Sequence, residues 1–401
     1  MSAKTHTGPT TGPPPAGPLA GVTVLDLASV GPAARCTRLL ADYGADVVKV
    51  GPVPSDSGVQ IEPAFFAYSG HRGMSRVLLD LKDPAGLEAF LTLAARADVV
   101  VESFRPGVAD RLGIGYEAVR AANPAVVYCS TSGYGQTGPH AGWAGHDVDY
   151  LGVGGFLATS GPRSDGGPPL PGATVADAAA GGMQAALAIT AALTGRQKTG
   201  EGAYLDVSVA DGVLWLMSLT IDEHLATGTD PGPGHDILTG RYACYDAYRA
   251  ADGRWLAVGA IEHKFFANLC RALGCDRWID HQLDDAVQDR IRADFAEVFA
   301  TRRRDDWMAE LSGTDTCVAP VLTAAEVASD EQFVHRGVVI EAVHPTEGRF
   351  RQLGPLLAGM ARPIAPIALP DPSVTDTDRR LVAAGVDSAT IDGWRSAGAV
   401  A

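Results

Sequence analysis

The feature that most constrains the fold is a repeated strand–helix–strand pattern near the start of the chain. Val22–Leu27 is predicted to be a strand, a helix begins at Pro32, and Asp46–Val50 is predicted to be the next strand. Proline suits the first helical turn, where its missing N–H costs nothing. Gly44 ends the helix, as glycine commonly does. Two strands joined by one helix form a βαβ unit, so the two strands run parallel.

The same pattern continues down the chain. Arg76–Leu81 and Asp98–Glu102 are predicted strands that flank a predicted helix at Pro84–Arg96, and Val126–Ser130 is a further strand. A parallel sheet is buried on both faces by its crossover helices. The sequence up to residue 135 therefore predicts a Rossmann-like α/β layer.

The rest of the chain predicts a second, smaller domain. Between residues 225 and 240 the composition changes to Gly, Pro, Asp and Thr, which favours a linker. A hairpin over Tyr242–Arg249 and Trp255–Val258 and a helix over Glu262–Leu273 then indicate an α+β domain. The expected organisation is a leader (1–17), a large domain (18–224), a linker (225–240), a small domain (241–325) and a return segment (326–401), whose residues 340–401 complete the large domain.

Charge and cysteine content exclude several classes of function. The chain has 47 Asp and Glu against 32 Lys and Arg, a net charge of −15. Such a surface repels nucleic acid and anionic lipid, so an anionic ligand needs a locally basic pocket. The six cysteines do not complete a zinc motif, and no metal or redox cofactor is implied.

The N-terminal residues predict no targeting segment. Residues 1–17 are rich in Pro, Gly and Thr, which is typical of a disordered leader rather than of a signal or transit peptide. No apolar run reaches the length of a membrane span. The expectation is a cytoplasmic protein without a membrane partner.

One glycine motif has the spacing of a dinucleotide-binding loop. Gly133–Gly138 follows a strand and matches the dinucleotide fingerprint G-x-G-x-x-G. That fingerprint needs a helix that opens on the glycines and holds a pyrophosphate at its N-terminus. Pro139 and the residues after it open no helix, so this segment is predicted to be a turn-forming loop.

The candidate chemistry lies between residues 145 and 177. His146, Asp147 and Asp149 follow the glycine loop, and Asp177 begins a predicted helix over residues 177–195. A histidine and an aspartate can each act as acid or base in proton transfer. The alternative is that Asp177 only caps its helix and His146 makes a structural hydrogen bond. These residues by themselves leave both interpretations open.

The start of that helix carries two further signals. The helix dipole and unpaired amides are expected to stabilise the anionic form of Asp177. Gly181 and Gly182 destabilise a helix, and their lack of side chains allows a ligand or another backbone to come close.

A set of motifs resembles a known family over about residues 18–365. The motifs are Pro18–Gly21, Leu39–Lys49, Leu79–Lys82, Arg105–Gly107, Arg111–Gly115, Gly133–Pro139, Gly145–Asp147, Ala176–Asp177 and Ala257–Glu262. Together they resemble the family III CoA-transferase superfamily and, within it, the α-methylacyl-CoA racemases.

The resemblance implies a fold and a reaction. It implies an interlocked homodimer of subunits with a Rossmann-like large domain and a small domain. His146 and Asp177 correspond to the two proton-transfer groups, and Glu262 corresponds to a carboxylate that orients His146. The implied activity is that of an isomerase of lipid metabolism, which inverts C2 of a 2-methylacyl-CoA through an enolate.

The resemblance also implies a set of CoA contacts. Family members often have basic residues after the strand ending at Val50 and before Leu79, but this chain has Pro52 and Met74-Ser75 there. CoA is therefore expected to rely more on Lys49, Arg72 or Arg76 for its phosphates, and Lys49 and Arg72 are added to the set. Surface ion pairs are the alternative role for Arg105 and Arg111. The implied binding set is Lys49, Arg72, Leu79, Asp80, Leu81, Lys82, Ser103, Phe104, Arg105, Arg111, Gly145, Asp147, Val148, Asp149 and Tyr150.

Two other functions fit the same residues. A family III CoA-transferase would use Asp177 as the nucleophile that forms an acyl anhydride, and would move CoA from an acyl-CoA to a carboxylate. A non-catalytic acyl-CoA-binding protein is the third possibility. In each case the ligand is an acyl-CoA thioester, and no cofactor beyond its CoA moiety is expected. The sequence does not identify the acyl group.

Overall fold

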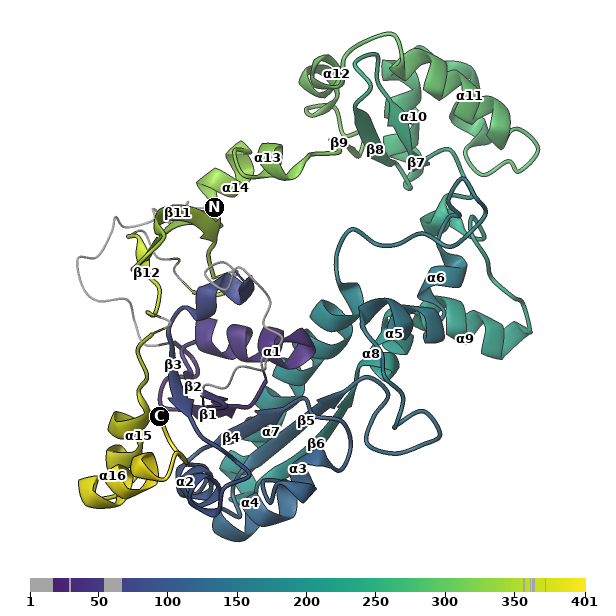
Figure 1. The fold of residues 1–401 in the computed structure, drawn as a ribbon. Coiled ribbons are helices and arrows are strands. Elements are labelled where there is room, and N and C mark those ends of the chain that lie inside the picture. Colours follow the sequence, from purple (N-terminus) through teal and green to yellow (C-terminus); the bar gives the residue numbers. More distant parts are fainter. Residues whose placement is uncertain are drawn as a thin grey trace. The chain divides into compact units, whose positions relative to one another are not determined.

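The structure is a computed structural model that describes residues 17–28, 30–53, 67–355, 358–360, 362, 365–371 and 373–401. Except for Gly17, the predicted leader lies outside the described residues. The chain divides into two compact units. The first takes in residues up to 154, 173–216 and 331–401, and the second takes in residues 155–172 and 217–330. Figure 1 labels their elements.

A parallel sheet organises the first unit. Its strand order is β3-β2-β1-β4-β5-β6, and every pairing is parallel. This is the strand order of a Rossmann fold, so the predicted α/β architecture is confirmed. The strands are β1 (Thr23–Asp26), β2 (Asp46–Gly51), β3 (Met74–Leu78), β4 (Val99–Glu102), β5 (Val127–Ser132) and β6 (Ala203–Ser208).

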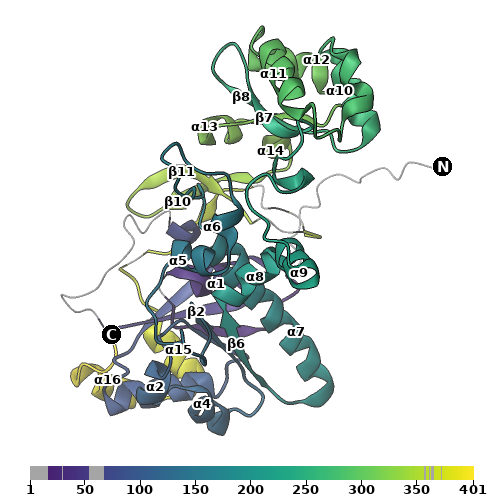
Figure 2. The same cartoon turned by 90° about the vertical axis from the view of Figure 1, so that its right-hand side faces the viewer.

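Helices cover both faces of this sheet (Figure 2). On one face, Cys36 and Leu40 of α1 (Gly31–Asp42) pack with Ile189 of a later helix against valines of the strands. On the other face, Phe90 of α2 (Pro84–Ala94) belongs to a second apolar core. The short helices α3 (Val108–Arg111) and α4 (Tyr116–Ala122) complete the loops on that side.

The predicted helix over residues 177–195 has a different geometry at its start. Ala176–Met183 forms a π-helix, here η2, and the regular helix α7 runs over Gln184–Thr199. A Cβ at Gly181 would lie 2.5 Å from Cβ of Pro32, so η2 packs directly against the start of α1. A Cβ at Gly212 of α8 (Val209–Leu216) would lie 2.1 Å from the carbonyl oxygen of Ala180. The glycines thus admit neighbouring backbones on two sides.

Together η2 and α7 form a continuous helical segment of 24 residues, Ala176–Thr199, which is long and apolar enough to cross a membrane by length and composition. The sequence was expected to contain no such run, and this expectation is wrong. The segment nevertheless lies against α1, β5 and β6 in the first unit, as a core helix does. This packing explains part of its apolar character, since 33% of the apolar window is buried and Met183 and Leu187 are exposed.

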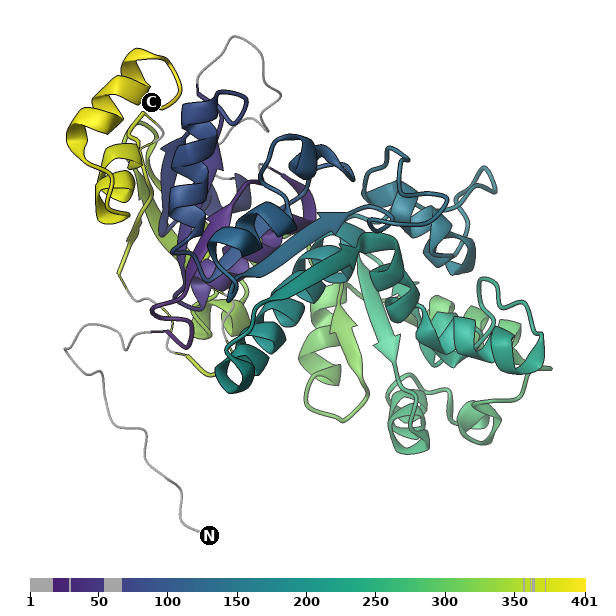
Figure 3. The same cartoon turned by 90° about the horizontal axis from the view of Figure 1, so that it is seen from below.

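The C-terminal residues return to the first unit. They form a small sheet of β10 (Val339–His344), β11 (Gly348–Leu353) and β12 (Ile367–Ala368), and then α15 (Thr377–Ala383) and α16 (Ser388–Ser396). In Figure 3 these last two helices, in yellow, lie beside α2. The backbone N–H of Asp80 donates to Ala399, and that of Ala401 donates to Leu78, so the chain end runs along β3.

The second unit is α+β, as predicted. Its sheet contains β7 (Tyr245–Arg249), β8 (Trp255–Gly259) and β9 (Val318–Pro320), all antiparallel. Three helices pack on an apolar core around Phe266, Phe295 and Trp307. The helices of this unit are α6 (Phe156–Thr159), α9 (Ser218–Thr227), α10 (His263–Ala272), α11 (Gln288–Phe299), α12 (Arg304–Leu311) and α13 (Ala324–Val327).

The units differ in extent from the predicted domains. Residues 155–172 and the predicted linker 225–240 both belong to the second unit. The predicted linker begins within the last turn of α9 and contains a short helix, Ile237–Thr239. Glycine and proline content alone does not distinguish a linker from a turn-rich part of a domain. Each of the six cysteines, all of which the structure describes, is a free thiol.

Candidate active site

The carboxyl ends of the strands define where a ligand is expected. In an open parallel sheet, ligands bind beyond these ends, where the strand order reverses. Here the reversal lies between β1 and β4. These two strands pair with each other, and on their other sides β1 pairs with β2 and β4 pairs with β5. The loops that follow β4 and β5, residues 103–107 and 133–146, lie at this edge.

The loop after β5 is built around the ring of Tyr150. A Cβ at Gly133 would lie 2.3 Å from this ring, and a Cβ at Gly145 would lie 2.7 Å from it. The Tyr150 hydroxyl donates to the carbonyl of Gly145 at 2.5 Å. Tyr150 belongs to α5 (Asp147–Val153), so its ring fixes the loop to the helix that starts at the candidate site.

The glycine fingerprint in this loop forms turns, as predicted. Gly135 and Gly138 have φ values of 83° and 93°, which other residues rarely adopt. The backbone N–H of Gln136 donates to the carboxylate of Asp206. The next helix after β5 is α5, which begins only at Asp147. The loop therefore lacks the helix that a dinucleotide site requires.

A hollow of about 410 Å³ separates this loop from the loop after β4. Seven of the predicted site residues line it: Ser103, Phe104, Arg105, Gly145, His146, Asp149 and Tyr150. Ser132, Gly133 and Trp143 also line the hollow, and these three were not predicted as site residues. The structure thus brings the predicted thioester-end residues and part of the predicted nucleotide-end residues to one place.

Asp177 is tied to this region through Asp147. The Asp147 carboxylate accepts the backbone N–H of Asp177 at 2.8 Å. Asp177 lies in the first turn of η2, after the N-cap Val175, and its side chain makes no cap hydrogen bond. Asp147 satisfies the helix end instead, so the interpretation of Asp177 as a simple cap is wrong.

The electrostatics of Asp177 differ from the expectation based on the helix dipole. Burial raises the pKa of its carboxyl above the usual value, Asp147 raises it further, and Arg35 and His146 oppose the rise. The Asp177 side chain is 17% exposed. Desolvation outweighs the nearby cation, so Asp177 is a more basic carboxylate than a surface aspartate.

His146 begins α5 and is exposed. Its backbone N–H donates to the Asp149 carboxylate at 2.8 Å. Its imidazole is electrostatically coupled to Asp177. The pKa of the Tyr150 hydroxyl is raised to about 12, first by burial and then by Asp177. An imidazole, a carboxylate and a neutral phenol therefore share one site.

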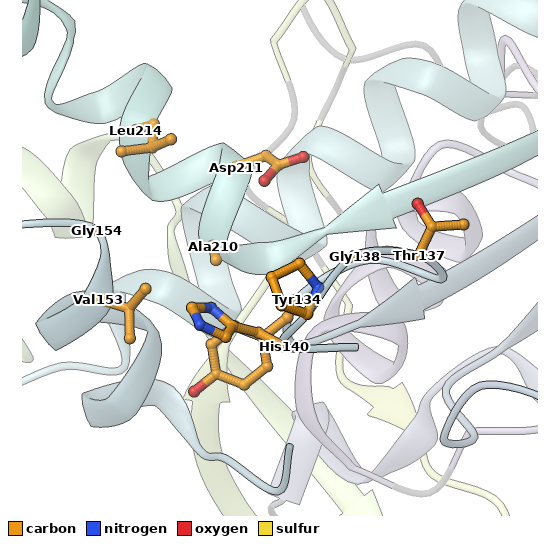
Figure 4. A pocket seen from close by; sticks show the side chains of 10 residues that line it. Tyr134, Thr137, Gly138, His140, Val153, Gly154, Ala210, Asp211 and Leu214 are labelled. Carbon is orange, nitrogen blue, oxygen red and sulfur yellow. The ribbon is translucent and has the colours of Figure 1, made fainter. Parts of the chain in front are cut away.

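A smaller hollow of about 170 Å³ lies on the other side of the glycine loop. Figure 4 shows Tyr134 and His140 of the loop on one side of it and Asp211 and Leu214 of α8 on the other. The His140 ring stacks on Trp143 with a centroid distance of 3.8 Å. Trp143 lines the larger hollow, so this aromatic pair is common to the walls of both.

Two side chains that were predicted to contact a CoA phosphate form ion pairs within the protein. The Lys49 ammonium binds Asp26, at 2.8 Å, and the carbonyl of Ala28. The Arg72 side chain is 5% exposed and binds Asp42 and the carbonyl of Leu353. Burial of this kind is incompatible with a direct contact of Arg72 with a CoA phosphate, and the prediction is corrected for this residue.

The remaining predicted nucleotide contacts do not line the hollow. Leu79 is buried in the core, while Asp80, Leu81 and Lys82 form the turn between β3 and α2. Arg111 is exposed at the end of α3. None of these five residues lines the hollow around His146.

A cationic region lies near β2 and β3. The 3₁₀ helix Ala67–His71 ends in a left-handed turn, with a φ of 52° at His71. The pKa of His71 is lowered to about 4, first by burial and then by Lys49, Arg38 and Arg76. Two of these cations are already paired, Lys49 with Asp26 and Arg38 with Asp42.

Glu262 lies in the second unit, where it is exposed and directly precedes α10. The structure describes Glu262 only within the second unit, so a contact between Glu262 and His146 stays a prediction. Within the described ranges, no group of three His, Cys, Asp or Glu side chains is arranged to hold a metal ion.

Sequence reasoning missed Arg35, whose guanidinium lies 3.7 Å from the Asp177 carboxylate. It also missed Ser132 and Trp143. Ser132 is the last residue of β5, and Trp143 is an exposed tryptophan in a glycine-rich loop. Strand ends and exposed aromatic residues mark binding sites, but the strand was predicted to end at Ser130, and the exposure of Trp143 is visible only in the structure. Arg35 gave no local signal, because its partner is 142 residues away.

Comparison with known proteins agrees with this geometry. The model of CoA-transferase family III matches residues 19–376. Human alpha-methylacyl-CoA racemase is 36% identical over 80% of this chain and 82% of its own length. Mouse succinyl-CoA:glutarate CoA-transferase is 31% identical over 84% of this chain and 80% of its own. The crystal structure of a CAIB/BAIF family protein from Brucella suis superposes with a TM-score of 0.74 at 28% identity, covering 93% and 100% of the two chains.

The fold and the hollow define an α/β protein with a pocket, lined by His146 and Arg105, at the edge of a Rossmann-like sheet. The chain belongs to CoA-transferase family III. Its relatives include both racemases and CoA-transferases, so it is an enzyme of acyl-CoA chemistry at the level of the family.

Proposed function

We propose that the protein is an acyl-CoA racemase, an isomerase that inverts C2 of a 2-methylacyl-CoA. The observation that carries this proposal is the hydrogen bond from the backbone N–H of Asp177 to the carboxylate of Asp147, the residue after His146, which brings Asp177 to the segment that holds the imidazole. Inversion needs one group that removes the α-proton and another that returns a proton to the opposite face. A transferase needs only the carboxylate, so the histidine favours the racemase.

The side chains of Asp177 and His146 are both suited to proton transfer. Burial raises the pKa of Asp177, which makes its carboxylate a stronger base. An imidazole such as that of His146 can both accept and donate a proton. In the proposed reaction His146 removes the proton from one enantiomer and Asp177 removes it from the other.

The enolate intermediate needs a hydrogen-bond donor at its oxygen. The N–H of His146 already donates to Asp149. Asp147 is the first residue of α5, so its N–H has no acceptor within the helix. We assign this N–H to the enolate oxygen.

The hollow between the loops supports an acyl-CoA as the substrate. Its walls combine Arg105 with the aromatic rings of Phe104, Trp143 and Tyr150. An arginine fork suits a phosphate, and flat rings suit the apolar part of the ligand. No cofactor beyond the CoA moiety enters the proposal. Fatty acyl substrates would place the enzyme in lipid metabolism.

We further propose that the active enzyme is a cytoplasmic homodimer and that Glu262 orients His146. The motivation is the resemblance in sequence, since a dimer would allow the Glu262-bearing unit of either subunit to complete a site. Glu262→Gln is expected to lower turnover and to change the pH dependence of the reaction through His146. Sedimentation of the purified enzyme checks the dimer.

Hydrogen exchange tests the proposed reaction. A 2-methylacyl-CoA of one configuration is incubated with enzyme in deuterated water, and α-deuterium and configuration are followed by mass spectrometry and chiral chromatography. The racemase incorporates deuterium while the configuration inverts. Asp177→Asn and His146→Ala each abolish inversion, whereas the exposed control variants Asp289→Asn and His335→Ala keep it. Absence of deuterium from the wild-type reaction would contradict the proposal.

CoA transfer is the second candidate, because Asp177 also has the position and partial exposure that a nucleophile needs. In that reaction the carboxylate attacks the thioester carbonyl, CoA leaves as its thiolate, and an acyl–aspartyl anhydride remains. Hydroxylamine converts this anhydride to a hydroxamate at Asp177, which peptide mass spectrometry detects. A hydroxamate in the wild-type protein without α-deuterium in the substrate would replace the racemase with the transferase.

A further inference from the structure

We propose that Arg35 is a positioning residue that holds the Asp177 carboxylate at the start of η2 and balances its negative charge. The proposal rests on the assignment of Asp177 to the reaction and deepens it. It assigns a function to a residue of α1 that neither the motifs nor the predicted site include.

The contacts of Arg35 surround Asp177. One terminal nitrogen donates to the carbonyl of Gly31, at 3.2 Å, and lies 3.7 Å from the Asp177 carboxylate. The other donates to the Thr174 hydroxyl at 2.6 Å. Thr174 lies two residues before η2, so one guanidinium joins the start of α1 to the segment that leads into Asp177.

The packing of the backbone fixes this arrangement. A Cβ at Gly182 would lie 2.8 Å from Cβ of Arg35 and 3.1 Å from the carbonyl oxygen of Pro32. Gly182 belongs to the same π-helix as Asp177. The glycine therefore brings η2 close enough to α1 for the arginine to reach the carboxylate.

The distance between the two charges fits a reactive carboxylate. At 3.7 Å the guanidinium attracts the carboxylate without a hydrogen bond to it. A bidentate pair would occupy the oxygen atoms that must exchange a proton with the substrate. Arg35 remains cationic at every working pH. It therefore supplies constant attraction and leaves Asp177 able to react.

The other charged groups near Asp177 act in both directions. Asp147 of α5 opposes its ionisation, and His146 favours it when protonated. Tyr150 is coupled to the same carboxylate. The one acidic residue of α8, Asp211, lines the smaller hollow instead. On α1, Arg35 is the residue whose positive charge favours the ionised form of Asp177.

The pH dependence of exchange tests the proposal. In Arg35→Gln the acid limb of kcat/KM moves to higher pH for the enantiomer whose proton Asp177 removes, because its carboxylate ionises less readily. Arg35→Lys restores most of the wild-type profile. Thr174→Val gives a smaller shift in the same direction. Arg120→Gln, which removes a cation from an exposed ion pair on α4, leaves the profile unchanged.

A direct titration separates this proposal from the proposed function. Carboxyl ¹³C NMR of aspartate-labelled protein, with Asp177→Asn used to assign the signal, follows Asp177 without any substrate. The signal titrates at higher pH in Arg35→Gln than in the wild-type protein and in Arg35→Lys. An unchanged titration overturns the role of Arg35, even if exchange activity is present. A shifted titration with no wild-type exchange keeps the role of Arg35 and overturns the racemase. Thermal unfolding confirms that each variant is folded.

Discussion

Two arginines of helix α1 each face a different carboxylate, and the two ion pairs differ in distance and in burial. Arg38 binds Asp42 at 2.6 Å, and Arg72 binds the same carboxylate at 2.9 Å. Three residues earlier on α1, Arg35 lies 3.7 Å from Asp177. The Asp42 side chain is 7% exposed, whereas that of Asp177 is 17% exposed.

The difference separates a structural carboxylate from a reactive one. Asp42 has two arginine partners in tight geometry, which compensates for its loss of hydration. Asp177 has one distant cation and a neighbouring carboxylate, and burial raises its pKa. A carboxylate that is fully paired cannot readily accept a proton, whereas an incompletely paired one can. Incomplete pairing is thus a mark of function here.

The largest expected effect is on turnover. Asp177→Asn preserves the shape of the side chain but removes its basicity, and α-proton exchange is expected to fall by about 10³-fold. Asp42→Asn is expected to leave exchange measurable in the protein that remains folded. Deuterium incorporation measured at equal folded concentration checks both. An equal loss of activity in the two variants would contradict the division of roles.

The second effect is on stability. Asp42→Asn leaves Arg38 and Arg72 buried beside a neutral amide, and the free energy of unfolding is expected to fall by about 3 kcal/mol. Urea unfolding followed by circular dichroism measures the change. Asp177→Asn serves as the matched carboxylate-to-amide control and is not expected to destabilise the fold at neutral pH. A stable Asp42→Asn protein would remove the structural half of the comparison.

A smaller effect concerns the glycine that brings α1 to η2. In Gly182→Ala the new methyl group meets Arg35 and the carbonyl oxygen of Asp177, so a stability loss of about 1 kcal/mol is expected despite the better helix propensity. Gly195→Ala on α7 is the control. No atom lies within 4 Å of its new Cβ, and a gain of up to about 1 kcal/mol is expected. Thermal unfolding of the pair distinguishes them, and equal shifts would contradict the close packing.

The smallest effect is a pH dependence of stability. Because the pKa of Asp177 is raised in the folded state, the folded protein binds this proton more tightly than the unfolded chain does. Its contribution to stability is therefore present at low pH and is lost as the pH rises through the folded-state pKa. Asp177→Asn is expected to be more stable than the wild-type protein at neutral pH. This advantage should fade as the pH falls toward about 4. Urea unfolding at several pH values measures it, and a pH-independent difference would contradict the sign.

Much of the fold was predictable because it depends on local patterns. Alternating strands and helices with prolines at helix starts predicted the parallel sheet, and the six-stranded sheet confirms it. The π-helix at Ala176–Met183 was not predictable from periodicity, since η2 and α7 form one apolar segment. Its geometry follows from the contacts of Gly181 with Pro32 and of Ala180 with Gly212, which join distant parts of the sequence.

The candidate site was predictable in part for the same reason. His146, Gly145 and Tyr150 are close in sequence, and they line one hollow with Ser103, Phe104 and Arg105. The assignment of Arg72 to a phosphate failed because its burial depends on Asp42 and on Leu353, 281 residues away. A basic residue next to a motif has the same appearance in a sequence whether it is paired or exposed.

The sequence by itself determined the Rossmann-like layer, the acidic surface and the presence of His146 and Asp177 at the ends of a glycine-rich segment. Only the tertiary structure decided that Asp147 satisfies the start of η2, that Arg35 reaches Asp177, and that Arg72 is used for internal pairing. The physical reason is that side-chain type and local periodicity are properties of the chain. Burial and charge pairing, by contrast, depend on which distant residues the fold brings together.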